Sequence, residues 1–114
     1  MEHIIHIDNS EFFRKLMKTY LSEKGIPSES FSSVEDAMKA VNANEASCII
    51  TGMELADMTG KDFMKQLTLS GKKIPVIIVT SREEEAAKSL SAFNVKAIIS
   101  KSGNWQKELD NVFD

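Results

Sequence analysis

Short apolar runs alternate with amphipathic stretches along the whole chain, and this alternation limits the possible folds more than any other feature. Four runs have the length and the β-branched content of strands, at residues 3–7, 46–51, 74–80 and 95–100, and a short extended piece lies at 29–31. The run IPVIIVT is apolar at consecutive positions, which predicts a strand buried on both faces. Strands that alternate with helices indicate a parallel sheet with helices on both faces. We therefore expect an α/β fold with a doubly wound, five-stranded parallel sheet.

Each predicted strand is followed by a stretch in which apolar residues recur at helical spacing. The five helices are expected to begin at Ser10, Ser33, Thr59, Ser81 and Trp105. Ser33 and Thr59 each have an acid three residues later, which is the pattern of a capping box. The first helix should stop before Gly25, and the fourth should end at Asn94 in a left-handed conformation.

Size and composition restrict the class of protein. A chain of 114 residues with 42% apolar residues suits one domain, residues 1–114, with no room for a linker or an effector domain. A net charge of −3 with scattered lysines and arginines argues against a nucleic-acid partner. No apolar run is long enough for a membrane span, and the start fits no secretory signal. The single cysteine, Cys48, lies in an apolar run, which predicts a small buried hydrophobic residue rather than a nucleophile. One cysteine also suits a reducing compartment, so we expect a cytoplasmic protein.

The polar residues that follow the predicted strands are the candidates for a functional site, because ligands of parallel sheets bind at the carboxyl edge. An acid and an amide follow the first strand, a glycine follows the third, a hydroxyl the fourth and a lysine the fifth. In that order they are Asp8 with Asn9, Gly52, Thr80 and Lys101. A further acid, Glu54, lies in the loop after the third strand.

These strand ends resemble the receiver domains of two-component response regulators, over essentially the full chain. The family's first strand ends in two adjacent acids, matched here by IDNSEFFRKL. Its third strand ends in the phosphoacceptor aspartate of a D-x-x-x-P-x-M-x-G loop, matched here by GMELADMTG at residues 52–60. A Thr or Ser ends the fourth strand, matched by Thr80, and Lys-Pro ends the fifth, matched by Lys101 and Ser102. Four matches in this order make the resemblance specific.

The resemblance implies a flavodoxin-like fold with strand order 2-1-3-4-5 and a role in signalling through protein contacts rather than as an enzyme. In the family, a magnesium ion held by the acids assists phosphoryl transfer to the aspartate, and the lysine pairs with the phosphoryl group. The strand-end hydroxyl then moves toward that group, and an aromatic residue on the fifth strand turns inward with it. The partner implied here is a signalling protein such as a histidine kinase, or a second copy of this chain.

The chain departs from the family at the positions that carry its chemistry. These departures are Asn9 for the second acid, Gly52 for the phosphoacceptor, Ala56 for the loop proline, Ile98 for the switch aromatic, and Ser102 for the proline after the lysine. Glycine has no nucleophile, so an acyl phosphate cannot form at position 52. Two of the three metal-binding carboxylates are also lost, so neither a metal nor a cofactor is expected. Without the proline, we expect a trans bond between Lys101 and Ser102.

Three functions compete. The leading one is a stand-alone pseudo-receiver, an interaction module that needs no phosphorylation at the usual position. The second is a response regulator that accepts phosphate at a substitute acid, Glu54 or Asp57, or in which Gly52 is an alteration of an active domain. The third, a flavodoxin-like redox protein, requires a loop rich in Gly, Ser and Thr after the first strand, where this chain has Phe12 and Phe13.

Simpler roles are open for several of these residues. Asp8 can be a helix-start acid paired with Lys101, and Thr80 can be an ordinary strand-end hydroxyl. We expect the Lys101 ammonium within about 4 Å of a carboxylate, from Asp8 or Glu54, in a partly exposed pair worth at most about 1 kcal/mol.

Two expectations concern other parts of the chain. His3 and His6 are three residues apart on a strand and point to opposite faces, so they cannot share a metal ion, and His6 is expected to be buried, neutral and hydrogen-bonded. The receiver resemblance implies an output face of the fourth helix, the fifth strand and the fifth helix. We expect this face to be held in one state because Ile98 has no polar tip to move. Trp105 and Phe93 are its candidate anchors if exposed, although a core position is at least as well supported for Trp105.

Overall fold

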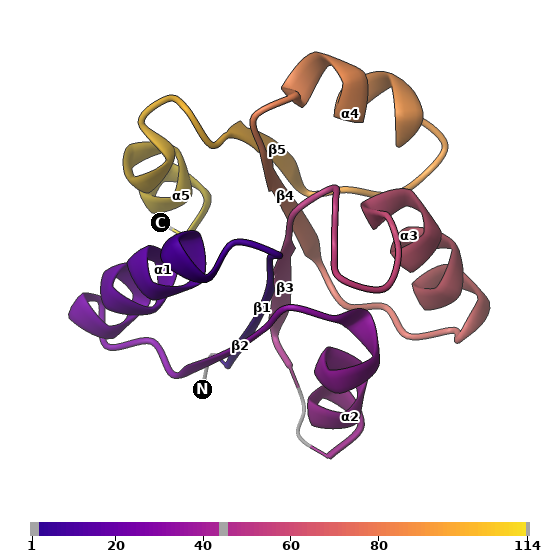
Figure 1. The fold of residues 1–114 in the computed structure, drawn as a ribbon, viewed down its shortest axis with the longest axis horizontal. Helices are drawn as coiled ribbons and strands as arrows, with labels where there is room; N and C mark the ends of the chain where they lie inside the picture. The colour runs from indigo at the N-terminus through magenta and orange to yellow at the C-terminus, as the bar shows by residue number, and fades with distance from the viewer. Residues whose placement is uncertain (1–2, 44–45, 114) are drawn as a thin grey trace.

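The computed structural model describes residues 3–43 and 46–113 and contains one sheet of five parallel strands in the order β2-β1-β3-β4-β5 (Figure 1). The strands are β1 (Ile4–Ile7), β2 (Ser28–Phe31), β3 (Cys48–Thr51), β4 (Val76–Thr80) and β5 (Ala97–Ser100). The helices are α1 (Glu11–Glu23), α2 (Val34–Ala43), α3 (Gly60–Leu69), α4 (Glu83–Ser89) and α5 (Trp105–Phe113). The predicted fold class and strand order are both confirmed.

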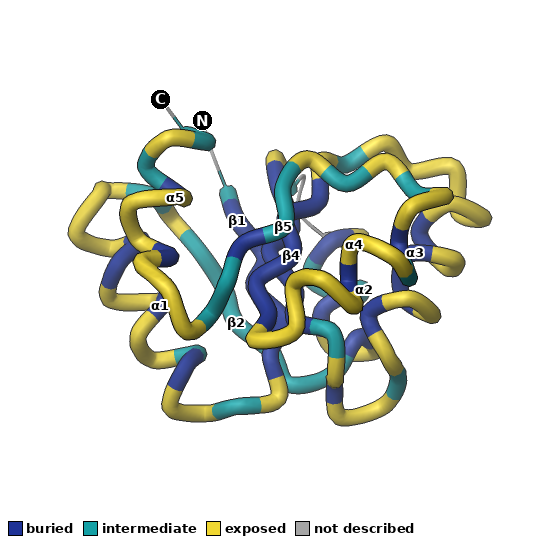
Figure 2. Tube along the Cα trace, turned by 90° about the horizontal axis from the view of Figure 1, so that it is seen from above, coloured by how far each residue is buried: buried dark blue, intermediate teal, exposed yellow. Residues whose placement is uncertain are grey.

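Helices cover both faces of the sheet, with α1 and α5 on one side and α2, α3 and α4 on the other (Figure 1). Successive residues of a strand point to opposite faces, so the strands contribute to two separate cores. Ile4 packs with residues of α1 and α5, whereas Ile5 and Ile7 pack with residues of the other three helices. The central strands are buried and the outer sides of the helices are exposed (Figure 2). The sheet is therefore fixed from both sides, and its carboxyl edge is left open.

Hydroxyl side chains begin the first three helices as predicted. Ser10 accepts a hydrogen bond from the Phe13 amide at the start of α1, and Thr59 accepts one from the Asp62 amide at the start of α3. Ser33 accepts a hydrogen bond from the amide three residues later, at the start of α2. Each bond satisfies an amide that has no partner inside its own helix.

Helix α4 departs from the sequence expectation at both ends. Ser81 does not cap it, because Arg82 occupies the N-cap position and makes no side-chain capping hydrogen bond. The helix stops at Ser89 instead of running to Asn94, and the chain turns through a bond from the Phe93 amide to the Leu90 carbonyl. Among the described residues, only two glycines have a positive φ, so the prediction of a left-handed conformation at Asn94 is wrong. Burial of Leu90 and packing of Phe93 against the core fix this turn in place of a helix end.

Two smaller expectations are confirmed. Cys48 is buried, in the core beneath α1 and α5. Every described peptide bond is trans, which includes the bond between Lys101 and Ser102. Within residues 3–43 and 46–113, no helix is both long and apolar enough to cross a membrane.

The two histidines lie in different surroundings. His3 pairs with Glu29 of the neighbouring strand, with 3.1 Å between Nε2 and Oε2. His6 is buried between the sheet and α1, with its ring edge-to-face against Phe13 at a centroid distance of 5.8 Å. The expected hydrogen bond of His6 is absent, since neither ring nitrogen has a partner among the described residues.

Burial lowers the pKa of His6 to about 4. The Asp8 carboxylate opposes this effect, while the charges of Lys101 and Arg14 lower the pKa further. The protonated ring would lose its hydration without gaining a hydrogen bond, so the folded protein holds His6 neutral.

The burial of His6 predicts a loss of stability in mild acid. The unfolded chain takes up this proton near its usual pKa of 6.5, whereas the folded chain takes it up only near 4. The contribution of neutral His6 to the free energy of unfolding should therefore be fully present above about pH 6.5. It should be lost as the pH drops toward 4, which lowers the free energy of unfolding by up to about 3 kcal/mol. Urea unfolding across this range measures the loss. His6→Met, which cannot titrate, should show a smaller loss, and parallel curves for the two proteins would contradict the assignment.

Candidate functional site at the carboxyl edge of the sheet

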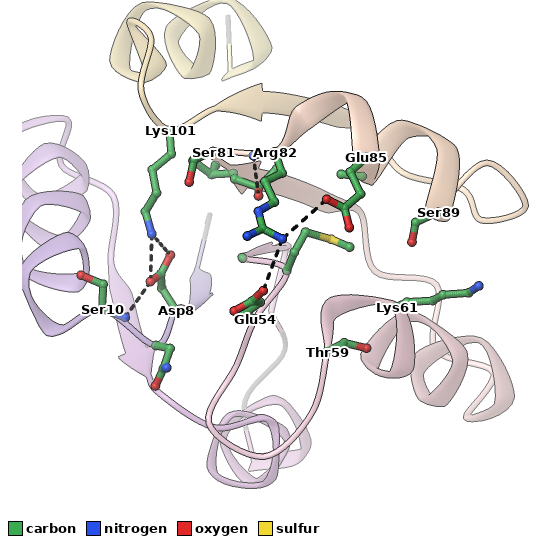
Figure 3. A pocket seen from close by; sticks show the side chains of 16 residues that line it. Asp8, Ser10, Glu54, Thr59, Lys61, Ser81, Arg82, Glu85, Ser89 and Lys101 are labelled. Carbon is green, nitrogen blue, oxygen red and sulfur yellow. Dashed lines mark hydrogen bonds and ion pairs between the residues drawn. The ribbon is translucent and has the colours of Figure 1, made fainter.

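A cavity of about 570 Å³ opens at the carboxyl ends of the central strands (Figure 3). All six residues of the predicted pocket line it, namely Asp8, Asn9, Gly52, Glu54, Thr80 and Lys101. The sequence analysis missed the lining residues that come from the surrounding helices and their approaches, chiefly Lys61, Arg82 and Glu85. The charged run after the fourth strand, SREEE, is the signal that could have found the last two.

Asp8 is fixed by the chain on both sides of it. Its amide donates to the Phe31 carbonyl of β2, and its carboxylate accepts a hydrogen bond from the Ser10 amide at 2.8 Å. The Arg14 guanidinium donates to the Asp8 carbonyl at 2.7 Å. The turn from β1 into α1 therefore places this carboxylate at the floor of the cavity.

Lys101 pairs with Asp8, as the sequence predicted. Its Nζ lies 2.9 Å from Oδ2 and 3.1 Å from Oδ1, and the Lys101 amide donates to the Thr80 carbonyl. The ammonium also lies over the ring of Phe13, 4.4 Å from its centroid. The pair is more buried than expected, because the Asp8 side chain is 5% exposed and that of Lys101 is 26% exposed. Removing one partner should therefore cost more than the expected 1 kcal/mol limit.

Gly52 directly follows β3 and lies beside the Asp8 carboxylate. Its amide donates to the Ile7 carbonyl, and a Cβ at this position would lie 3.2 Å from Oδ2 of Asp8. A side chain here would therefore press on the carboxylate that Lys101 binds. Gly60 closes the loop that follows, because its amide donates to the Met53 carbonyl, and a Cβ there would lie 2.8 Å from the Gly52 carbonyl oxygen.

The charges at the rim form a second, weaker group. Glu54 is 80% exposed and pairs with Arg82 at 3.9 Å, and the same guanidinium group lies 3.7 Å from Glu85 (Figure 3). Exposed pairs at these distances add little stability. Lys101 thus binds Asp8 and not Glu54, and Glu54 is open to solvent.

Asp57 lies outside the cavity and caps a helix. Its Oδ1 accepts from the Val34 amide at 2.9 Å and its Oδ2 from the Glu35 amide at 3.0 Å, both at the start of α2. Desolvation raises the pKa of Asp57, but these backbone hydrogen bonds outweigh it and lower the pKa. A carboxylate with both oxygens bound in this way has no geometric support as a substitute phosphoacceptor. Local sequence carries no sign of this contact, because more than 20 residues separate the partners.

Comparison with known proteins identifies the family. The family model for the response regulator receiver domain matches residues 4–112. The chain belongs to the response regulator receiver domain family. Among curated proteins, it is similar to the response regulator protein TodT of Pseudomonas putida, with 26% identity over 65% of this chain and 33% of TodT. It is also similar to the transcriptional regulatory protein SrrA of Staphylococcus aureus, with 27% identity over 72% of this chain and 34% of SrrA. The chain thus spans about a third of the length of these relatives.

Solved receiver structures share the fold. The chemotaxis response regulator CheY4 of Vibrio cholerae has a TM-score of 0.85 and 21% identity, with 98% of both chains covered. The response regulator TrrA of Thermotoga maritima, solved in complex with Mg²⁺ and BeF, has a TM-score of 0.83 and 21% identity, with 99% of this chain and 97% of TrrA covered. At this level of identity the comparison establishes the receiver architecture.

The residues at the receiver switch positions have other contacts here. The Thr80 hydroxyl accepts a hydrogen bond from the Arg82 amide at 3.1 Å, and Thr80 is buried. Ile98 is partly buried and packs against the core beneath α2, α3 and α4. Trp105 is 5% exposed and lies in the opposite core, which confirms the core position considered for it and leaves it no role as an exposed anchor. Phe93 is half-buried.

The magnesium ion implied by the receiver resemblance does not fit the residues of this pocket. Both oxygens of Asp8 contact Lys101, and Oδ1 also accepts from the Ser10 amide. Asn9 adds no charge and Gly52 adds no ligand side chain. Among the described residues, no group of three His, Cys, Asp or Glu side chains could hold a metal ion. Magnesium normally requires carboxylate ligands, and the single pocket carboxylate at the strand ends, Asp8, already has the Lys101 ammonium as its counter-ion.

Removal of the ammonium should destabilise the fold. Lys101→Met leaves the buried Asp8 carboxylate without its cation, and we expect the free energy of unfolding to fall by more than about 1 kcal/mol and by up to about 3 kcal/mol. Asp8→Asn in the same chain should recover part of the loss, because the uncompensated charge is gone. Lys61→Met, which removes an exposed lysine of the same cavity, should stay within about 0.5 kcal/mol. Equal effects of the two lysine substitutions in urea unfolding would contradict the pair's contribution.

Asp57→Ala should weaken the start of α2. We expect a loss of about 1 kcal/mol, typical of a removed helix cap, with faster hydrogen exchange at the Val34 and Glu35 amides. Glu54→Ala, an exposed acid of the same loop, serves as the control and should change neither quantity. Unchanged exchange at the two amides would show that Asp57 does not hold them.

Proposed function

We propose that this chain is a pseudo-receiver, a signalling module that acts through protein contacts without an acyl phosphate at position 52, and that it is not an enzyme. The observation that carries the proposal is the end of β3. Gly52 lines the receiver pocket beside a carboxylate that is already neutralised by Lys101. The position that would need a nucleophile therefore has none, and the Asp8 carboxylate beside it is already paired with Lys101.

The output face supports the same proposal. Ile98 on β5 packs into the core through a stiff, β-branched side chain with no polar atom, so it has no reason to move between water and the interior. The α4 and β5 side of the output face, which α4, β5 and α5 form together, is then held in one state. Its partner is a signalling protein, such as a histidine kinase or a second copy of this chain, and Phe93 is the remaining aromatic candidate for an anchor on it.

Phosphorylation at a substitute acid is the second candidate function, and the contacts of the two acids favour Glu54 for it. Glu54 lines the cavity and is exposed, whereas Asp57 uses both oxygens to cap α2. A phosphorylated Glu54 would make the chain an active response regulator. This alternative is chemically distinct from the first, because it requires a covalent change at an identified side chain.

Treatment with a phosphodonor separates the two candidates. Incubated with acetyl phosphate and magnesium, the unaltered protein should gain no phosphoryl mass by intact-mass spectrometry. Gly52→Asp should be labelled weakly, and Gly52→Asp with Asn9→Asp more strongly, since the second change supplies another carboxylate to a metal. Labelling that disappears in Glu54→Gln would establish the substitute acceptor and overturn the pseudo-receiver. Equal labelling of the single and double variants would contradict the role given to Asn9.

A further inference from the structure

A line of aromatic rings begins directly beneath the ion pair of the pocket. The Lys101 ammonium lies 4.4 Å from the centroid of the Phe13 ring. Phe13 meets Trp105 edge-to-face at 5.1 Å, and Trp105 meets Tyr20 edge-to-face at 5.4 Å. All three rings are buried in the core between α1, α5 and the sheet. We refer to Phe13, Trp105 and Tyr20 as the ring line.

The ring line reaches the surface where α1 meets α5. The Tyr20 hydroxyl donates a hydrogen bond of 2.6 Å to Oδ1 of Asp110, and Lys24 forms an ion pair with the same oxygen. The Lys24 ammonium also lies 5.4 Å from the centroid of the Tyr20 ring. Both Lys24 and Asp110 are partly exposed. Tyr20, Lys24 and Asp110 therefore form a seam that is continuous, through packed rings, with the floor of the pocket.

The opposite side of the pocket has no comparable connection among its switch residues. The Thr80 hydroxyl is bound to the Arg82 amide, and Ile98 packs into the other core without a polar atom. The moving parts that a receiver uses to reach α4 and β5 are thus absent or engaged. The contacts of Lys101 run instead to Asp8 and to Phe13, both on the side of α1.

Lys101 links the pocket to the ring line. Its long side chain is partly exposed, and its ammonium is shared between the Asp8 carboxylate and the face of the Phe13 ring. An anionic group that enters the cavity beside Gly52 would compete for the ammonium. Phe13 would then lose its cation, and the electrostatic preference that fixes its ring against Trp105 would change.

We infer that the seam of Tyr20, Lys24 and Asp110 is the surface of this protein that responds to charge in the pocket. Lys101 senses the charge, and the ring line carries the change in packing to α1 and α5. The inference is independent of the proposed function, because any anionic group in the cavity acts in the same way, whether it is covalently attached or not. Labelling of Glu54 by a phosphodonor would therefore overturn the pseudo-receiver and leave this inference standing.

The chain carries its own reporter for the test. Trp105 is the only tryptophan, and it is the middle member of the ring line. Gly52→Asp places a carboxylate in the cavity, and Gly52→Asn places a neutral group of the same shape there. The indole N–H resonance of Trp105 and the amide resonances of Tyr20, Lys24 and Asp110 should shift in the aspartate variant more than in the asparagine variant.

Three controls locate the effect. In Lys101→Met protein, the difference between the Asp and Asn variants at Trp105 should disappear, because the charge sensor is gone. Glu54→Gln changes the charge at the rim and should leave the Trp105 resonance in place. In a double-mutant cycle, Gly52→Asp and Asp110→Asn should be non-additive by more than about twofold in the unfolding equilibrium constant, whereas Gly52→Asp and Ser89→Ala should be additive.

Each of the contrary results is decisive. Equal shifts for Asp and Asn at position 52 would show that shape, not charge, is sensed. A shift that persists without Lys101, or one confined to α4 and β5, would overturn the route through the rings. If Gly52→Asp folds poorly, Lys101→Met in the otherwise unaltered protein still tests the route from Lys101 through the ring line. Its Trp105 fluorescence must change while that of Lys61→Met does not, and no difference between the two overturns the inference.

Discussion

The ion pair between Asp8 and Lys101 is the contact on which the rest of the site depends. It joins the residue after the inner strand β1 to the residue after the edge strand β5, across the cavity at the carboxyl ends of the strands. Each partner is held by backbone hydrogen bonds, from the Ser10 amide to Asp8 and from the Lys101 amide to Thr80. A buried carboxylate is costly without a cation, so the pair fixes the position of the loop after β5 as well as the charge of the pocket.

The absence of a side chain at position 52 determines which groups the Lys101 ammonium contacts. With a glycine there, the Asp8 carboxylate and the Phe13 ring are the partners of the ammonium, and a Cβ would come within 3.2 Å of Asp8. A receiver pocket that normally gathers negative charge for a metal thus becomes one in which opposite charges already cancel. The same contact connects the pocket to the aromatic core beneath α1 and α5, because the ammonium lies over Phe13 and Phe13 packs on Trp105.

The sequence analysis succeeded where neighbouring residues determine the outcome. The alternation of apolar runs and helical stretches predicted the sheet, and the residues after each strand predicted the part of the lining that the strand ends supply. It failed where distant contacts decide. Asp57 has no local sign of its capping contact with α2, because its partners lie more than 20 residues away. His6 was expected to have a hydrogen bond, yet its strand faces apolar side chains of α1.

The sequence by itself determined the fold class, the edge of the sheet that carries the site, and the absence of a nucleophile at position 52. These follow from periodicity and from residue identity, which are local properties. Tertiary structure decided which of two acids Lys101 binds, how deeply that pair is buried, and that Trp105 lies inside and not on the surface. Each of these depends on distances between segments far apart in the chain. Burial and pairing energies are set by those distances, and no local pattern of residues records them.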